Sequence, residues 1–184
     1  ECKPDMAVVL IGSNDAMGSL SPSSAKRYQK SNKLPKPPSF DDYQQLLTQL
    51  LERLESIPHV ALCTLPPVGE IPDSTTNQHV AQFNQFIQSI AEEKNITLLN
   101  VSHAMWENLS QRTYPVIYDY ESKILVLGKR IINACFRHYV FKTPWDTIAQ
   151  SQGQWLLFDQ IHLGERGSKT IKQLVSNYLK ETSL

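Results

Sequence analysis

The sequence has few of the features that mark membrane, nucleic-acid-binding or nucleotide-binding proteins. No apolar run approaches the ~20 residues that a bilayer span requires, so we expect no membrane span. Lysine plus arginine equals aspartate plus glutamate, 18 against 18, and no arginine-rich stretch occurs, which argues against a nucleic-acid partner. No glycine-rich phosphate loop is present. A generic α/β domain that binds a nucleotide is therefore the least favoured function.

Cysteine is also scarce, and its spacing is wrong for a metal or disulfide site. Cys2, Cys63 and Cys135 are odd in number and far apart, and no CxxC pair occurs. Cys63 lies within the apolar run VALCTL, where a buried and inert thiol is expected. The sequence therefore gives no reason to expect a bound metal.

Residues 1–7 contain neither a signal peptide nor an initiator methionine, and by residue 8 the chain is already in a strand-like apolar run. A domain that starts on a core strand is expected to be part of a longer one. Three N-x-S/T sequons, at Asn95, Asn100 and Asn108, are compatible with a secretory route but arise often by chance. The localisation therefore stays unknown.

Short apolar runs alternate with amphipathic helices along the chain. The runs 7–12, 59–67 and 96–102 are typical of buried strands, the first of them central in a parallel sheet. Apolar residues at helical spacing predict helices between Ser39 and Pro58, over Val80–Ala91, over 123–141 and over Ile171–Leu179. This order favours parallel pairing with right-handed crossovers. We expect one domain over residues 1–184, with a long loop over 16–39 and an irregular insertion over 103–158.

Two polar clusters follow predicted strands, where open α/β sheets bind their ligands. The first is Gly12-Ser13-Asn14-Asp15, and the second is Asp159-Gln160-Ile161-His162. An aspartate three residues before a histidine in a turn can fix the tautomer and orientation of the imidazole, which then serves as general base and acid. An asparagine at a strand end offers an N–H donor for an oxyanion hole. Each cluster alone is common, and a surface turn is the simpler interpretation of either.

The two clusters together resemble the SGNH (GDSL-type) hydrolases. KPDMAVVLIGSND is similar to the third sequence block of that family, and FDQIHLGERGSKTIKQLV to its fifth block and terminal helix. The resemblance covers most of the chain and is weakest over 103–158. It implies an α/β fold, a flavodoxin-like three-layer α/β/α sandwich with a mainly parallel sheet. It also implies hydrolysis of an ester or acyl bond through a serine acyl-enzyme, without a cofactor.

The resemblance also implies roles for single residues. By position, His162 is the catalytic base, Asp159 is the carboxylate that orients it, and Asn14 is an oxyanion-hole donor. Gly12 and Asp15 belong to the same motif, Asp15 as a structural residue that hydrogen-bonds loop backbone. The substrate is expected to be a small-molecule ester or acylated compound, and a lipid ester, an acetylated sugar and a small ester all remain open.

One part of the family pattern has no counterpart. The family's nucleophile lies in a Gly-Asp-Ser segment after its first strand, upstream of the G-x-N-D block, and a second oxyanion donor lies between them. Ser13 is a poor substitute, and the serines of residues 19–31 lack a strand-to-turn context. We therefore expect the first strand and the nucleophile to belong to an N-terminal segment outside this chain, which is missing, removed or a separate chain. The alternative is a catalytically inactive SGNH-like binding or scaffolding module.

Other candidate side chains carry two interpretations each. His103, directly after the third predicted strand, either lines the site or is a capping or packing residue, and the second is favoured. Trp106, Trp145 and Trp155 either line an acyl or sugar pocket or pack in the core or rim, with packing as the default. The histidines without a partner pattern are taken as structural: His59, His79 and His138.

Overall fold

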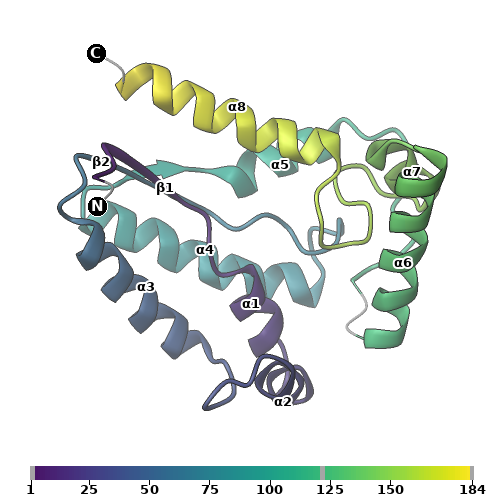
Figure 1. The fold of residues 1–184 in the computed structure, drawn as a ribbon, viewed down its shortest axis with the longest axis horizontal. Helices are drawn as coiled ribbons and strands as arrows, with labels where there is room; N and C mark the ends of the chain where they lie inside the picture. Colours follow the sequence, from purple (N-terminus) through teal and green to yellow (C-terminus); the bar gives the residue numbers. More distant parts are fainter. Residues whose placement is uncertain (1–2, 121–122, 183–184) are drawn as a thin grey trace. The chain divides into compact units, whose positions relative to one another are not determined.

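The structure is a computed structural model that describes residues 3–120 and 123–182. Cys2, which the sequence assigns to no metal or disulfide site, lies outside the described residues. The described residues fall into two compact units (Figure 1). The first is built from residues 3–66, 79–100 and 178–182, and the second from residues 67–78 and 101–177.

The first unit holds a parallel sheet of three strands in the order β1 (Met6–Val9), β2 (His59–Cys63) and β3 (Thr97–Leu99). This confirms the α/β class and the parallel pairing. The strand predicted over 7–12 was expected to be central, and that is wrong for the described sheet, because β1 lies at its edge. The side chains of Val8, Leu10 and Ile11 are accordingly exposed.

The middle strand of this sheet carries the buried thiol. Cys63 is 1% exposed, and burial raises its pKa to about 11. A thiol with so high a pKa stays protonated near neutral pH and is a poor nucleophile. The expectation of a buried, inert Cys63 is confirmed.

Helices cover both faces of the sheet within this unit. The strand connections are α3 (Phe40–Leu54) and α4 (Thr75–Glu93), which pack together through Tyr43 and Phe83, with ring centroids 4.8 Å apart. The hydroxyl of Ser39 accepts the N–H of Asp42 and caps α3, as predicted. On the other face lies the last part of α8 (Glu165–Thr182), and Figure 1 shows the sheet between it and the α3–α4 pair.

The loop predicted over residues 16–39 is largely helical, so that prediction is wrong. The segment contains the end of α1 (Ser13–Ser19) and the whole of α2 (Pro22–Ser31), and a loop remains over residues 32–39. The Ser21 hydroxyl accepts the N–H of Ser24, and Pro22 stands at the first helical position. These are helix-start signals. The serines and the proline of this segment therefore mark the start of α2 and not a loop.

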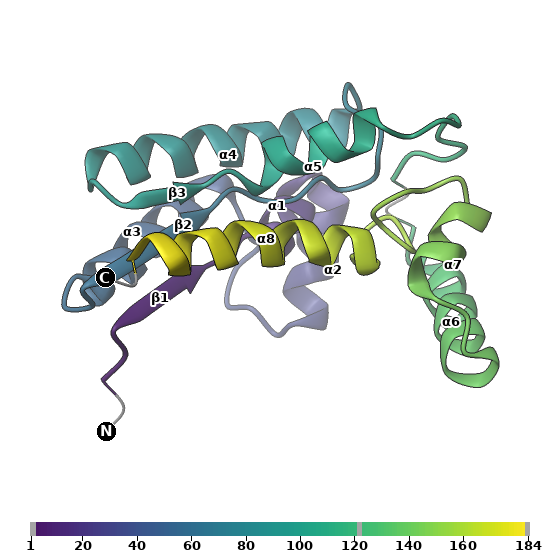
Figure 2. The same ribbon diagram turned by 90° about the horizontal axis from the view of Figure 1, so that it is seen from above.

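The second unit contains α5 (Val101–Ser110), α6 (Ile124–Phe141), α7 (Trp145–Ser151) and most of α8. The helix predicted over 123–141 is confirmed by α6, which lies beside α7 (Figure 2). The strand predicted over 96–102 is confirmed only in part, because α5 begins at Val101. In the part of the chain that the structure describes, no helix is long and apolar enough to cross a bilayer.

Candidate active site

The loop that carries Asp159 and His162 is a tight hairpin in the second unit. Leu157 and Leu163 form an antiparallel bridge at its base. The Phe158 N–H donates to the His162 carbonyl at 3.0 Å, and the chain leaves the hairpin at Gly164. These bonds fix the backbone on both sides of the turn. The positions of the two functional side chains are therefore set by the turn itself.

Asp159 is fully buried and uses its two carboxylate oxygens differently. Oδ1 accepts the backbone N–H groups of Ile161 at 3.0 Å and His162 at 2.7 Å, which builds the turn. Oδ2 accepts the Nδ1–H of the His162 ring at 2.6 Å. One side chain thus shapes the loop and holds the imidazole, as the D-x-x-H pattern predicts.

His162 is held on one side and open on the other. Its side chain is 57% exposed, whereas that of Asp159 is 0% exposed. Because Nδ1 donates to a carboxylate, Nε2 is the nitrogen that can accept a proton. The hydrogen bond to Asp159 raises the pKa of His162 above its ordinary value, partial burial opposes this, and the negative charge of Asp159 adds to the rise. The ring is therefore a stronger base than a free histidine.

A column of stacked rings supports the imidazole. Phe158 stacks on His162 with centroids 5.8 Å apart, and Trp145 stacks on Phe158 at 4.1 Å. His138 from α6 stacks on Trp145 at 3.9 Å. The column restricts the tilt of the His162 ring and connects α6 and α7 to the hairpin. Phe158 was not identified from the sequence, because a single aromatic residue before an aspartate has no distinctive pattern.

A buried carboxylate holds the strand-like segment that leads into the hairpin. Glu70 is 0% exposed and accepts the backbone N–H groups of Trp155, Leu156 and Leu157, the last two at 2.7 and 2.9 Å. The Arg112 guanidinium donates to it at 2.8 Å. A glutamate in a loop gives no sequence signal that its side chain will be buried, so this residue was missed.

Gln160 anchors the tip of the hairpin. Its φ of 80° lies in the left-handed region, which is costly for a residue with a side chain. The cost is offset by fixed partners: its N–H donates to Gln154 Oε1 at 3.0 Å, and its carbonyl accepts the Gly69 N–H at 2.8 Å. Its side chain also donates to the Asp119 carbonyl. Hydrogen bonds to three other segments of the chain therefore hold the turn.

The G-x-N-D cluster lies at the start of α1 in the first unit. Gly12 has a φ of 124°, and a Cβ there would lie 2.5 Å from the ring of Tyr43, so only glycine fits. Asn14 lies in the first turn of α1 and is exposed. Asp15 is half-buried, and burial raises its pKa. Since the hairpin belongs to the second unit, the approach of Asn14 to His162 stays a prediction.

The decisive comparison is with known families. Residues 1–170 match the GDSL-like Lipase/Acylhydrolase family. The chain belongs to this family. Comparison with curated proteins gives no match.

Solved structures of similar fold include Axe2, an acetylxylan esterase from Geobacillus stearothermophilus, with 17% identity and a TM-score of 0.62. A catalytic mutant of Axe2 gives 15% identity and a TM-score of 0.63. LAE5, an α/β hydrolase enzyme from the metagenome of Lake Arreo in Spain, gives 17% and 0.58. Each comparison covers 96% of this chain and 60% of the other. The likeness confirms the predicted SGNH-type fold, and the chain spans 60% of the length of these structures.

The resemblance to SGNH hydrolases implies a nucleophilic serine, and one serine of the first unit lies beside a histidine. Ser19 Oγ is 3.0 Å from His79 Nε2. The Ser19 hydroxyl donates its proton to the Asp15 carbonyl at 2.7 Å within α1, so His79 must be the donor of the other bond. Burial lowers the pKa of His79, which keeps its ring neutral. The pair joins α1 to α4 and does not activate Ser19.

The remaining candidates of the sequence have structural partners. His103 Nε2 lies 3.3 Å from Glu107 Oε1, and both side chains are 67% exposed. The Trp155 indole N–H donates to Asn108 Oδ1 at 2.8 Å, and the Arg166 guanidinium lies 3.9 Å above its ring. Trp106 lines a cavity of about 330 Å³. Trp155 both packs against these partners and lines a cavity of about 470 Å³.

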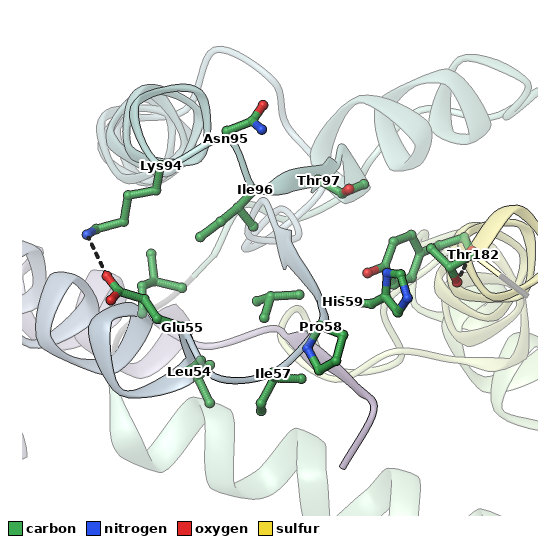
Figure 3. A pocket seen from close by; sticks show the side chains of 13 residues that line it. Leu54, Glu55, Ile57, Pro58, His59, Lys94, Asn95, Ile96, Thr97 and Thr182 are labelled. Atoms are coloured by element: carbon green, nitrogen blue, oxygen red, sulfur yellow. Dashed lines mark hydrogen bonds and ion pairs between the residues drawn. The ribbon is translucent and has the colours of Figure 1, made fainter. Parts of the chain in front are cut away.

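Another cavity, of about 440 Å³, lies in the first unit at the amino ends of β2 and β3. Leu54, Ile57 and Ile96 contribute to its lining, and Lys94 pairs with Glu55 at 3.8 Å (Figure 3). Sites of open α/β sheets lie at the opposite, carboxyl ends of the strands. This cavity is therefore not a candidate for the ester site of a GDSL-like protein.

Proposed function

We propose that this chain carries the acid–base half of an ester-hydrolysing active site whose nucleophilic serine is supplied by a segment outside it. The observation that carries the proposal is the bond of 2.6 Å from His162 Nδ1 to Asp159. Because that carboxylate is buried and the imidazole is half exposed, Nε2 of His162 is available to a reacting hydroxyl. The substrate is a small-molecule ester or acylated compound.

The mechanism follows from these atoms. His162 Nε2 takes the proton of the serine hydroxyl as the serine oxygen attacks the ester carbonyl, and Asp159 stabilises the imidazolium that forms. The side-chain N–H of Asn14 donates to the oxyanion of the tetrahedral intermediate. His162 then protonates the leaving alcohol. In the second half, His162 takes a proton from water as the water oxygen attacks the acyl carbonyl. His162 then returns the proton to the serine oxygen as the bond to the acyl group breaks and the carboxylic acid leaves.

The position of the serine outside this chain is supported by the related esterase. Axe2 variants that replace a serine, an aspartate or a histidine are called catalytic mutants, and the aspartate precedes the histidine by three residues. Asp159 and His162 have the same separation. The Axe2 serine lies further before its aspartate than the whole stretch that precedes Asp159 in this sequence.

The test compares two histidines in the full-length gene product. His162→Ala is expected to lower kcat on p-nitrophenyl acetate by ~10³-fold or more, because the general base is lost. His103→Ala, which removes another exposed histidine with a carboxylate partner, is expected to keep the wild-type rate. Equal rates for His162→Ala and the wild type would sink the proposal. A full-length protein without activity on any ester would favour the binding-module alternative.

Asn14 is tested in the same assay. Asn14→Ala is expected to lower kcat by about 10²–10³-fold with little change in KM, because an oxyanion donor acts mainly on the transition state. Asn177→Ala, an exposed asparagine on α8, serves as the matched control. An Asn14→Ala variant with wild-type kcat contradicts the oxyanion role and leaves that of His162 intact.

A further inference from the structure

Helix α6 exposes an apolar face. Leu125, Ile132, Phe136 and Val140 are 77, 71, 54 and 56% exposed, and we call them the α6 stripe. Their spacing of seven, four and four residues places them on one side of the helix. Ala134 lies on the opposite side and is 0% exposed. Leu127 and Ile131 lie on the same side as Ala134 and are partly buried, so α6 is apolar both toward the protein and toward the outside.

The outward side of an ordinary surface helix is polar, so the exposed apolar side of α6 is unusual. The apolar surface continues past the stripe, because Tyr139 and Phe141 are 65 and 67% exposed, and Phe141 lies 5.4 Å from Phe136 between ring centroids. A contiguous exposed apolar patch of this kind marks an interaction site in a folded protein.

The charge around the α6 stripe identifies its partner. Residues 123–145 contain no aspartate or glutamate, although the chain as a whole has no net charge. The basic residues of this segment are Lys123, Lys129, Arg130, Arg137 and Lys142. Lys129 is exposed and follows Leu125 by four residues, so it lies on the same side of the helix as the stripe. Arg130 and Arg137 lie further round the helix, beside Tyr118 and Ser151 respectively.

We propose that α6 docks on an anionic lipid surface. The α6 stripe inserts at the boundary of the acyl chains, and the basic residues bind the phosphate groups of the lipid heads. Apolar side chains on one face with only basic charges around them are typical of helices that lie in the membrane interface. The helix does not span the bilayer, because its Ala134 side packs on the protein.

The stacked rings connect α6 to the proposed active site on the side of the helix away from the stripe. His138, in the last turn of α6, begins the column that passes through Trp145 and Phe158 to His162. Docking would therefore hold the catalytic hairpin near the lipid surface. That consequence rests on the proposed function, whereas the docking itself does not depend on it.

Co-sedimentation of the full-length protein with vesicles tests the proposal. Binding is expected to vesicles of phosphatidylcholine mixed with phosphatidylserine, to be weaker to phosphatidylcholine alone, and to fall at high salt. The double variant Ile132→Asp/Phe136→Asp should lower the partition coefficient at least about tenfold, and Lys129→Gln about fivefold. Leu46→Asp is the matched control, since Leu46 is 60% exposed on α3, and should bind as the wild type does.

Three outcomes would overturn the proposal: no binding of the wild type to anionic vesicles, unchanged binding of the double variant, or equal loss in Leu46→Asp. The proposal would also be overturned if the wild type dimerises without binding vesicles and the double variant is monomeric in analytical ultracentrifugation. That result would assign the α6 stripe to a second copy of the chain. Circular dichroism checks the fold, and Lys129→Gln replaces the double variant if that variant does not fold. His162→Ala should bind vesicles normally, which separates this test from that of the proposed function.

Discussion

Two histidines of this chain lie beside a carboxylate three or four residues away, but their surroundings give them different chemistry. His103 and Glu107 are both largely exposed on a helix, so their attraction is screened by water. Asp159 is buried and already accepts two backbone N–H groups, so its remaining oxygen faces His162 with little freedom to move. The difference lies in the carboxylate and not in the spacing of the pair.

The pH dependence of the proposed reaction follows from this pair. His162 must be neutral to act as a base, and its pKa is raised because Asp159 accepts its Nδ1–H. The acidic limb of kcat/KM is therefore expected to lie above pH ~6.5, the ordinary value for histidine. Asp159→Asn removes both the acceptor charge and its bond, so it should move this limb to lower pH and reduce kcat ~10⁴-fold. A pH–rate profile measures both effects, and an unmoved limb would contradict the role of Asp159.

The same shift has a consequence for stability. The protonated form of His162 is favoured in the folded state, because its pKa there is higher than in the unfolded chain. The contribution of the pair to stability is complete below the unfolded pKa of ~6.5 and is lost as the pH rises through the folded pKa. Urea unfolding of the wild type and of Asp159→Asn, measured below pH ~6.5 and above the folded pKa of His162, follows that loss of stability.

At the scale of elements, Glu70 joins separate segments of the second unit. Its carboxylate is fully buried and accepts the N–H groups of the segment before the hairpin and the guanidinium of Arg112. A strand in a sheet would satisfy these N–H groups with a neighbouring strand. Here one side chain replaces that neighbour, so the base of the hairpin depends on a charge.

Glu70→Gln is therefore expected to lower the free energy of unfolding by about 3 kcal/mol, because it removes one partner of a buried ion pair. The new amide also turns an N–H donor toward the N–H groups of Trp155 and Leu156. Urea denaturation measures the change. Glu107→Gln, at an exposed glutamate, should change it by less than ~0.5 kcal/mol. A Glu70→Gln variant as stable as the control would show that the hairpin is held by other contacts.

The elements also show what the sequence could predict and what it could not. Apolar periodicity located α3 and α6, and the D-x-x-H pattern predicted the Asp159–His162 bond, because these depend on local spacing. The serines and proline of α2 were interpreted as loop residues, although the same residues also cap helices. The burial of Glu70 depends on residues far along the chain, and no local pattern contains that information.

At the scale of the whole molecule, the open question is what lies beside β1. The Asp5 carbonyl accepts the His59 N–H at 3.2 Å, and in a parallel ladder alternate residues face the same neighbour. The register of Val8 opposite Ala61 then turns the backbone groups of Val8 away from β2 and toward the free edge. An exposed, apolar strand edge is a surface that takes a further strand. The proposed segment with the nucleophilic serine would provide that strand.

Proline scanning of β1 in the full-length protein tests this pairing, because proline cannot donate a ladder hydrogen bond. Ala7→Pro should destabilise the protein in any case, since Ala7 faces β2. If a strand pairs with the outer edge of β1, Val8→Pro should also lower the free energy of unfolding by about 2–3 kcal/mol and reduce ester hydrolysis. If β1 is an edge strand in the complete protein, Val8→Pro should behave like the conservative control Val8→Thr. The serine must then reach His162 by a route that does not extend this sheet.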